Sequence, residues 1–449
     1  MGTMGSRLAN WVAGLRYEEL PPEAIHEAKR RVIDSIGCAL GAYRSAPARI
    51  ARLEAQDVSD ACGATVWGTR HKTTPSLAAF ANGTMVRYLD FNDTYLSKEP
   101  AHPSDNIPAA LAVAQSADLA GKEALLGMVI GYEVQCRLCD AASLRARGWD
   151  HVYYGALSTA LLSGRLWGLD AARLEHALGL AGVCNIATRQ TRTGQLSMWK
   201  ACAFANAARN GLFAASLARR GMTGPHEIFE GPKGIFRMLT GPFELELAGD
   251  GDFMINRTYI KYWPAEYHSQ SAIDAALRLR EEIGPARMEG ISIGSFEAAV
   301  SIIGSEPEKW RPTSRETADH SMPYCVAVAL LDGEVTLRSF EEERLRDPKV
   351  LALLDVTKVY EDPALNAGYP EGIPNHLRIR LADGRTLDQR VDFPRGHARN
   401  PMSDEEVVAK FDRLAEGVVS RATAERIVDR CWRLDKLTNV SELLEFAVL

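Results

Sequence analysis

The sequence predicts a mainly α-helical protein: a large all-helical domain with a smaller α+β domain inserted into it. Helical periodicity, rich in Ala and Leu, runs from the N-terminus to about residue 255. Between about residues 265 and 395 short β-branched and alternating segments replace it, and helical periodicity returns over 403–449. A helical tail after such a segment indicates that the C-terminus rejoins the first domain. We expect a helical domain over 1–264 and 400–449, and an α+β domain over 265–399.

The expected helices begin with the segment 23–42, where Ala24, Ala28 and Val32 recur at helical spacing. Two prolines precede this segment, at positions where a helix tolerates proline. Alanine-rich helices pack closely, which favours the interior of a helix bundle. The other helices expected in this domain cover 76–89, 108–119, 121–147, 155–167, 171–180 and 200–220.

Strand signals are confined to the later part of the chain. The segment 290–303 has a strand-like density of Ile and Val, and 356–361 is short and β-branched. The segment 376–393 alternates between apolar and polar residues around Asp383-Gly384. Asp-Gly between alternating runs predicts a β-hairpin, so these segments indicate a small sheet.

Composition excludes several classes of protein. The chain has 449 residues, 52 Lys and Arg against 58 Asp and Glu, and a net charge of −6. With 46% hydrophobic residues it is not disordered, and mild acidity argues against binding nucleic acid. No apolar stretch approaches the roughly 18 residues of a membrane span. We also find no signal peptide, so we expect a cytoplasmic protein without membrane partners.

Eight cysteines in 449 residues do not form a disulfide scaffold. Cys136 and Cys139 make a lone CxxC pair within an expected helix. An iron–sulfur cluster needs more ligands than this one pair supplies. We therefore expect these cysteines to pack in the core, and we predict no metal site and no cofactor.

The segments 90–95 and 101–106 place Asp, Asn, Thr, His and Ser between two expected helices. Such a polar loop at a helix start is a common active-site arrangement, which makes Asp93, His102 and Ser104 candidate residues. The alternative is structural, since Ser104 or Asp105 can cap the following helix.

His151 and Lys200 each stand at the start of an expected helix. The helix dipole disfavours a charged His151, which suits a neutral base, and a surface-loop histidine is the alternative. Lys200 is surrounded by apolar residues and has Ala203 and Phe204 at i+3 and i+4, so we expect a substrate carboxylate as its counter-ion. The alternative is a lysine that extends to the surface.

Two further histidines, His268 and His320, each precede an apolar helix, and Tyr324 follows the second. Taken singly, each is more often a capping or core feature than a catalytic one.

Together these segments identify the chain as resembling the MmgE/PrpD family, from about residue 8 to 446. That family includes 2-methylcitrate dehydratase, cis-aconitate decarboxylase and iminodisuccinate epimerase. The segments that carry the resemblance are 32–37, 88–96, 102–106, 197–200, 221–236, 262–272, 320–328 and 400–403.

The resemblance implies a homodimer without an iron–sulfur cluster, and an active site between the helical and lid domains. It implies functional roles for the matching residues Asp93, His102, His151, Lys200, His268 and Tyr324. The segment 91–95, followed by 102–106, looks like the 2-methylcitrate dehydratase version. The decarboxylase version usually has a second Asp where Asn92 stands, and it lacks the Asp105-Asn106 pair.

Dehydration of a 2-hydroxytricarboxylate needs a base, an acid for the leaving hydroxyl, and positive charge for the developing enediolate. We expect His151 as the base and His102, with Asp93, at the leaving group, although exchanged histidine roles fit the sequence equally well. Substrate carboxylates are assigned to Lys200, His268 and Tyr324, with Ser104 as a further substrate ligand. The alternatives are a decarboxylase, an epimerase and, from another class, a non-catalytic binding protein.

Overall fold

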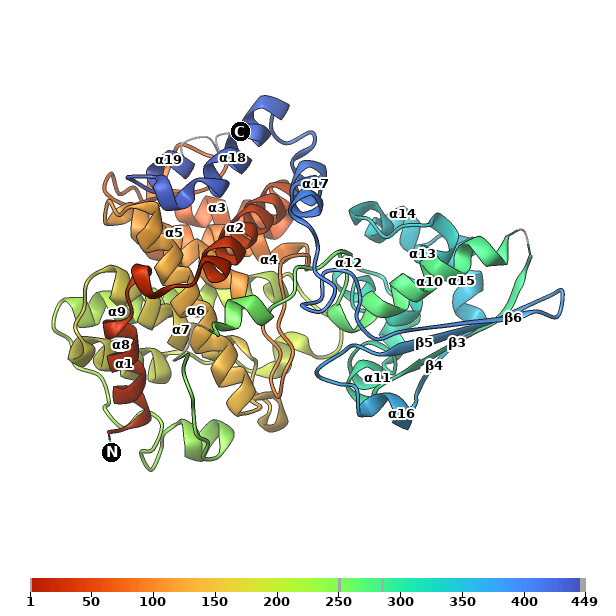
Figure 1. Ribbon diagram of the computed structural model, residues 1–449, viewed down its shortest axis with the longest axis horizontal. Coiled ribbons are helices and arrows are strands. Elements are labelled where there is room, and N and C mark those ends of the chain that lie inside the picture. The colour runs from red at the N-terminus through yellow and green to blue at the C-terminus, as the bar shows by residue number, and fades with distance from the viewer. Residues whose placement is uncertain (1, 249–251, 285, 445–449) are drawn as a thin grey trace. The chain divides into compact units, whose positions relative to one another are not determined.

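The computed structural model describes residues 2–248, 252–284 and 286–444. The chain forms two compact units, whose elements are labelled in Figure 1. Of the described residues, the first unit contains 2–192, 198–248, 252–258 and 403–444, and the second contains 193–197, 259–284 and 286–402. The predicted fold, mainly helical with a small α+β region, is confirmed.

The first unit is a bundle of helices with a two-stranded antiparallel ribbon, β1 (Ala64–Thr65) and β2 (Lys72–Thr73). Its helices are α1 (Met4–Gly14), α2 (Pro22–Ala42), α3 (Ala46–Gln56), α4 (Pro75–Tyr88), α5 (Ile107–Ser116), α6 (Gly121–Ala141), α7 (Val152–Leu166), α8 (Ala171–Cys184), α9 (Trp199–Arg219), α17 (Asp404–Ala415), α18 (Arg421–Trp432) and α19 (Ser441–Leu444). The 3-10 helices in its loops include η2 (Pro103–Asn106) and η4 (Arg189–Arg192).

Helix α6 is shorter than expected, since the predicted helix 121–147 ends at Ala141. The carboxylate of Glu99 explains this end. It accepts hydrogen bonds from the Ser143 hydroxyl at 2.9 Å and from the amides of Leu144 and Arg145 at 2.7 and 3.0 Å. These bonds replace the backbone acceptors that a continuing helix would supply. The long-range partner is invisible to helical periodicity.

The small residues of α7 and α9 let the two helices approach closely. A Cβ added at Gly211 on α9 would lie 2.5 Å from the carbonyl oxygen of Ala156 on α7. A Cβ added at Gly155 would lie 2.4 Å from the Phe204 ring. This contact fixes the starts of α7 and α9, and therefore the backbone that carries His151 and Lys200.

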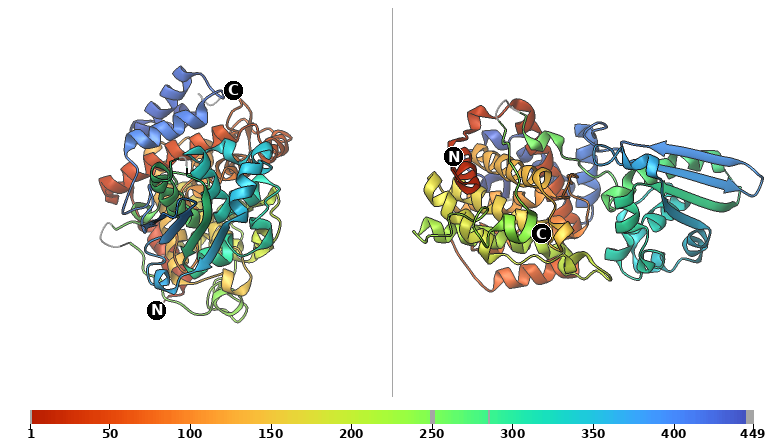
Figure 2. Two further views of the ribbon diagram at one scale, coloured as in Figure 1. Left: turned by 90° about the vertical axis from the view of Figure 1, so that its right-hand side faces the viewer. Right: turned by 90° about the horizontal axis from the view of Figure 1, so that it is seen from below.

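In the second unit, a four-stranded sheet has the order β4 (Thr357–Glu361), β3 (Met288–Ser295), β5 (Asn375–Leu381), β6 (Thr386–Val391). Strands β3 and β4 are parallel, and the other two pairings are antiparallel. Along β5, buried Leu377 and Ile379 alternate with exposed Arg378 and Arg380, so one face of the sheet is covered (Figure 2). The expected hairpin at Asp383-Gly384 is confirmed as the β5–β6 turn.

The helices of the second unit are α10 (Gln270–Ile283), α11 (Glu297–Ile303), α12 (Arg315–Ala318), α13 (Met322–Asp332), α14 (Glu342–Leu345), α15 (Pro348–Asp355) and α16 (Pro363–Asn366). The strand-like segment 290–303 is only half a strand, because β3 ends at Ser295 and α11 follows. In α11, Ala298, Ala299 and Ile303 are buried, a helical spacing that β-branched density does not reveal.

The C-terminal tail belongs to the first unit, where α17 packs against α2. Gly37 and Gly41 on α2 permit this contact, since a Cβ on Gly37 would lie 3.1 Å from Phe411 and one on Gly41 2.8 Å from Leu414. Among the described helices, none has the length and apolar character needed to cross a membrane.

Gly211→Ala should lower the melting temperature, although alanine is the better helix former. Alanine would gain about 1 kcal/mol of helix propensity, but overpacking against the α7 backbone costs about 1–3 kcal/mol. Gly14→Ala is the matched control, because a Cβ there meets nothing within 4 Å. Thermal unfolding of both variants checks this. Equal melting temperatures would contradict the close packing of α7 and α9.

Candidate active site

His151 and Asp150 form an oriented pair at the start of α7. The Nδ1 of His151 lies 2.8 Å from Oδ1 of Asp150, which is 1% exposed. Burial alone would raise the pKa of Asp150, but Arg192, whose Nε donates to Oδ2 at 3.0 Å, and His151 outweigh it and hold that pKa well below its usual range. The ionised carboxylate therefore keeps the proton on Nδ1. The Nε2 of His151 is buried and has no hydrogen-bond partner among the described residues.

A loop from α8 to α9 brings Arg192 to this pair. Its backbone runs beside the residues before α7, with Asp150 N donating to Ala187 O at 2.8 Å and Arg189 N donating to Gly148 O at 2.9 Å. Burial and the nearby Arg145 lower the pKa of Arg189. Guanidinium groups therefore gather beside the Asp150–His151 pair, where they can attract an anion.

His102 is a neighbour of His151, with ring centroids 5.9 Å apart. Its Nδ1 donates to the backbone carbonyl of Asp93 at 2.8 Å, and Arg87 donates to its Nε2 at 2.9 Å. A carbonyl only accepts, so the proton is on Nδ1 and Nε2 is the acceptor. The expectation that the Asp93 carboxylate orients His102 is wrong, because the backbone oxygen of Asp93 holds the ring.

The Asp93 carboxylate instead holds the loop together. Its Oδ1 accepts from the amide of Ser104 at 2.9 Å and its Oδ2 from the Tyr132 hydroxyl at 2.6 Å, with Nε of Arg31 at 3.7 Å. Complete burial raises the pKa of Asp93. The side chain of Ser104 accepts from Asn92 at 2.9 Å and is fully buried. The predicted substrate-ligand role of Ser104 is therefore not supported, because its hydroxyl belongs to the loop's own network.

Asp105 is a buried carboxyl group in the same network. Its Oδ1 accepts from Asn92 at 2.8 Å, and its Oδ2 lies 3.9 Å from Nε of Arg87 without a hydrogen bond. Burial raises the pKa of Asp105 to about 7, with Arg87 opposing and Asp93 reinforcing the shift. Asp105 therefore changes charge near neutral pH. In the sequence, Asp105 is a candidate helix cap, and local pattern does not reveal that burial raises the pKa of its carboxyl group.

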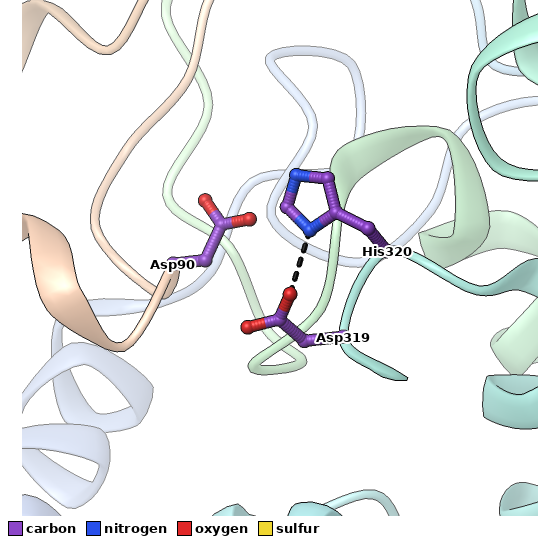
Figure 3. Close-up of side chains that lie close together, drawn as sticks. All are labelled: Asp90, Asp319 and His320. Atoms are coloured by element: carbon purple, nitrogen blue, oxygen red, sulfur yellow. Dashed lines mark hydrogen bonds and ion pairs between the residues drawn. The ribbon is translucent and has the colours of Figure 1, made fainter. Parts of the chain in front are cut away.

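Lys200 on α9 has an acidic neighbour that helical spacing did not reveal. Its Nζ lies 3.5 Å from Oδ2 of Asp90, and the two side chains are 4% and 1% exposed. Asp90 follows α4 in the left-handed region, with φ of 51°, and also pairs with Arg87 (Figure 3 draws Asp90). The sequence analysis expects a substrate carboxylate as the counter-ion of Lys200, but the structure places a carboxylate of the protein beside it. Packing of α4 against α9 supplies the carboxylate instead.

In the second unit, carboxylates hold the two histidines that the sequence analysis singled out, His268 and His320. The Nδ1 of His268 lies 2.7 Å from Oε1 of Glu266, and its buried Nε2 has no hydrogen-bond partner among the described residues. Burial opposes ionisation of Glu266, but His268 lowers its pKa to about 2. Figure 3 shows the second pair, where Nδ1 of His320 lies 2.6 Å from Oδ1 of Asp319. The sequence contains both acids within two residues of the histidines. The spacing could therefore have indicated these carboxylate–histidine pairs, which the sequence analysis did not infer.

Tyr324 departs from its expected role. It lies on α13, is fully buried, and its hydroxyl donates to the carbonyl of Ser339 at 2.6 Å. Burial raises the pKa of this phenol, so it stays protonated. With its single proton committed to Ser339, Tyr324 is a core residue of the second unit and not a substrate ligand in this geometry.

Cys136 and Cys139 are both buried on α6, where burial raises the pKa of each thiol well above its usual range. This environment is that of packed core thiols. All eight cysteines lie in the described part of the chain, and no disulfide bond joins any two of them there.

Thus Asp93, His102, Ser104, His151 and Lys200 all belong to the first unit, and Asp90 and Arg87 link Lys200 to His102.

Comparison with known protein families identifies the family of this chain. The MmgE/PrpD N-terminal domain matches residues 6–248, and the MmgE/PrpD C-terminal domain matches residues 263–434. The chain belongs to the MmgE/PrpD family.

Relatives of this MmgE/PrpD chain include 2-methylcitrate dehydratases and a cis-aconitate decarboxylase. The 2-methylcitrate dehydratase of Salmonella typhimurium is 31% identical over 421 residues, covering 86% of this chain and 84% of that protein. The 2-methylcitrate dehydratase of Cupriavidus necator is 32% identical over 415 residues, with 86% and 84% covered. The cis-aconitate decarboxylase of Mus musculus is 28% identical over 456 residues, with 97% and 91% covered.

Asp150→Asn should lower kcat of this MmgE/PrpD enzyme by on the order of 10²–10⁴-fold, as when the carboxylate behind a catalytic histidine is neutralised. The amide cannot hold the proton on Nδ1 of His151 as the carboxylate does. Asp388→Asn is the control, because it alters another Asp–His contact of 3.0 Å, with His376 on the sheet. Steady-state kinetics of both variants decide. Similar losses in both would remove the special role of Asp150.

Asp105→Asn should change how stability depends on pH. A carboxyl pKa raised by folding, here to about 7, contributes stability that is present at low pH and lost as pH rises through that value. A shift of roughly 3 pKa units corresponds to up to about 4 kcal/mol. The asparagine variant escapes this loss, so its melting temperature relative to wild type should rise between pH 5 and pH 8.

The control for Asp105→Asn is Asp57→Asn at an exposed position. Its melting temperature should follow that of the wild type across the same pH range. A difference between Asp105→Asn and wild type that is constant with pH would show that Asp105 does not titrate there.

Proposed function

We propose that the chain is a hydro-lyase that dehydrates 2-methylcitrate, or a close 2-hydroxytricarboxylate, to 2-methyl-cis-aconitate by acid–base catalysis with protein side chains. The observation that carries the proposal is the Asp150–His151 pair beside the ring of His102, in which the buried Nε2 of His151 has no hydrogen-bond partner among the described residues. The family and the names of the dehydratase relatives support the substrate class.

His151 is the base in this proposal. The Nε2 of His151 has no hydrogen-bond partner among the described residues, whereas the Nε2 of His102 accepts a hydrogen bond from Arg87. This difference distinguishes the two histidines, whose roles the sequence left interchangeable. Nε2 of His151 takes the proton from the carbon next to a substrate carboxylate, and the electron pair of the broken C–H bond forms the enediolate. Ionised Asp150 stabilises the resulting imidazolium.

The leaving hydroxyl is assigned to His102. The C–O bond breaks as the enediolate electrons form the C=C bond, and the hydroxide takes a proton and leaves as water. For His102 to supply that proton, Arg87 must release Nε2 and the ring must begin the cycle as an imidazolium, because a ring that accepts from Arg87 at Nε2 carries only its Nδ1 proton. Water restores the proton to His102 and takes up the one that His151 removed, so the cycle balances. Asp105, whose pKa lies at about 7, is a second buried group that can hold a proton in this network.

Positive charge for the substrate comes from Lys200 and the guanidinium groups beside it. Lys200 shares Asp90 with Arg87, so a substrate carboxylate exchanges with part of an existing ion pair and does not neutralise an isolated cation. The exchange avoids the cost of a buried unpaired charge in the empty site. The substrate-ligand role of His268 and the lid role of the second unit stay predictions.

Incubation of the purified enzyme with a panel of hydroxyacids tests the proposal. Dehydration of 2-methylcitrate should raise the ultraviolet absorbance of a conjugated double bond without release of carbon dioxide. His151→Gln should abolish the rise, and Asp388→Asn should leave it intact because that surface residue of β6 is not part of the site. Carbon dioxide release from an unsaturated tricarboxylate would instead support the second candidate, a decarboxylase, which the Mus musculus relative favours.

Deuterium uptake into substrate without net elimination would support an epimerase, the remaining enzyme alternative. Binding of the panel without any conversion would support a non-catalytic binding protein. These readouts separate the enzyme alternatives because each reports a different bond. Absorbance reports loss of the C–O bond, carbon dioxide reports cleavage of a C–C bond, and deuterium uptake reports exchange at a C–H bond.

Activity should also survive incubation with a chelator. Every proposed step uses a side chain of the protein, so removal of divalent cations should leave kcat unchanged. Turnover measured before and after treatment with EDTA checks this. A loss restored by Fe²⁺ or Mg²⁺ would contradict the mechanism.

A homodimer in the cytoplasm completes the proposal. The family resemblance suggests the dimer, and the exposed apolar side chains Val183 and Ile186, which are 55% and 80% exposed, support association of copies. Free thiols and the bacterial relatives support the compartment. Light scattering coupled to size exclusion measures the assembly.

A further inference from the structure

A buried lysine in the C-terminal tail reaches the loop that carries Asp90 and Asp93. Lys410 lies on α17 and is 1% exposed. Its Nζ donates to the backbone carbonyl of Phe91 at 2.6 Å and lies 3.8 Å from the centre of the Phe91 ring. The same Nζ is 2.6 Å from Oδ1 of Asp34 on α2. One ammonium group therefore joins three segments of the first unit.

The bond to Phe91 acts on the part of the loop where orientation matters. Asp90 precedes Phe91 and contacts Lys200, while Asn92 follows it and donates to Asp105 and Ser104. Holding the Phe91 carbonyl fixes the peptide plane between residues 91 and 92. The directions of the side chains on both sides depend on that plane.

Stability alone does not account for a charge at this position. A buried ion pair is commonly replaced by apolar residues of similar volume with no loss of stability. An apolar pair at 34 and 410 would fill the space between α2 and α17, but it would leave the Phe91 carbonyl without its donor. The lysine supplies a hydrogen bond that packing cannot.

We propose that Lys410 is a positioning residue: through the Phe91 carbonyl it holds the loop that presents Asp90, Asn92 and Asp93, so that the C-terminal tail completes a site built from the N-terminal half. The inference rests on the proposed dehydration only for its kinetic readout. Lys410 acts through the loop and does not touch substrate. The tail is then a part of the catalytic apparatus as well as of the fold.

The decisive variants separate stability from positioning. Asp34→Leu combined with Lys410→Met replaces the ion pair with an apolar pair and removes the donor. We expect the apolar pair to offset most of the cost of the unpaired Phe91 carbonyl, so that the melting temperature falls only slightly. We expect kcat to fall about 10²-fold with a smaller change in KM, as for a misplacement of about 1 Å in catalytic groups. Asp34→Asn keeps the donor and should show the opposite, lower stability with kcat close to wild type.

Lys29→Met is the matched control, because Lys29 on α2 pairs with Asp435 of the tail at the same distance of 2.6 Å and the pair does not reach the loop. Its kcat should equal that of wild type. Lys410→Gln provides a rescue, since its amide can donate to the Phe91 carbonyl without a charge. At equal folded fraction, Lys410→Gln should retain more turnover than Lys410→Met.

A folded double variant with wild-type kcat would overturn the proposal. If the double variant does not fold, the comparison of Lys410→Gln with Lys410→Met, assayed well below their melting temperatures, decides, and equal turnover of the two would overturn it. If wild type and Lys29→Met both fail to dehydrate any hydroxyacid, the proposed function fails instead. Hydrogen exchange of the amides of residues 90–94 then tests Lys410 independently, with faster exchange expected in Lys410→Met than in Lys410→Gln and equal exchange overturning the proposal.

Discussion

The guanidinium group of Arg87 holds the candidate site together. It is 3% exposed, pairs with Asp90, donates to His102 at 2.9 Å and places Nε 3.9 Å from Asp105. The planar fork of arginine suits such a set of acceptors, which the single ammonium of a lysine would not satisfy. Without it, two buried carboxyl groups would lose a cation and His102 would lose the donor that orients it. The ion pair of Lys200 with Asp90 and the proton held by Asp105 both depend on this balance.

Much of the fold was predictable because amphipathic helices and alternating strands leave periodic patterns. Helix α2, the helices from α4 to α9, the β5–β6 hairpin and the helical tail follow from such patterns, whereas α3 was not predicted. The errors lie where distant groups decide the outcome. Glu99 ends α6 by accepting backbone amides 45 and 46 positions away, and burial of Ala298 and Ile303 makes a helix of a β-branched segment. Local pattern does not contain these contacts.

The candidate site was predictable in its residues more than in their partners. Polar residues between apolar helices marked His102 and His151, and the structure places their rings side by side. The partner of Lys200 was not predictable, because Asp90 lies on another helix end and reaches it through tertiary packing. For the same reason the Tyr324 hydroxyl, which a carbonyl of its own unit occupies, was mistaken for a ligand. A residue type in a sequence indicates which chemistry a side chain can perform. Only the fold determines which of its atoms are left without a partner inside the protein.

The packing of α17 on α2 has a consequence for the order of folding. The second unit is almost continuous in sequence, whereas the first unit needs contacts between residues near the two ends of the chain. During synthesis, α2 emerges long before α17. The face of α2 around Gly37 and Gly41 therefore lacks its packing partner until the second unit has been synthesised. Closing so long a loop is slow compared with local folding. The inserted unit can thus fold first, and by bringing its own two ends together it shortens the search that joins α17 to α2.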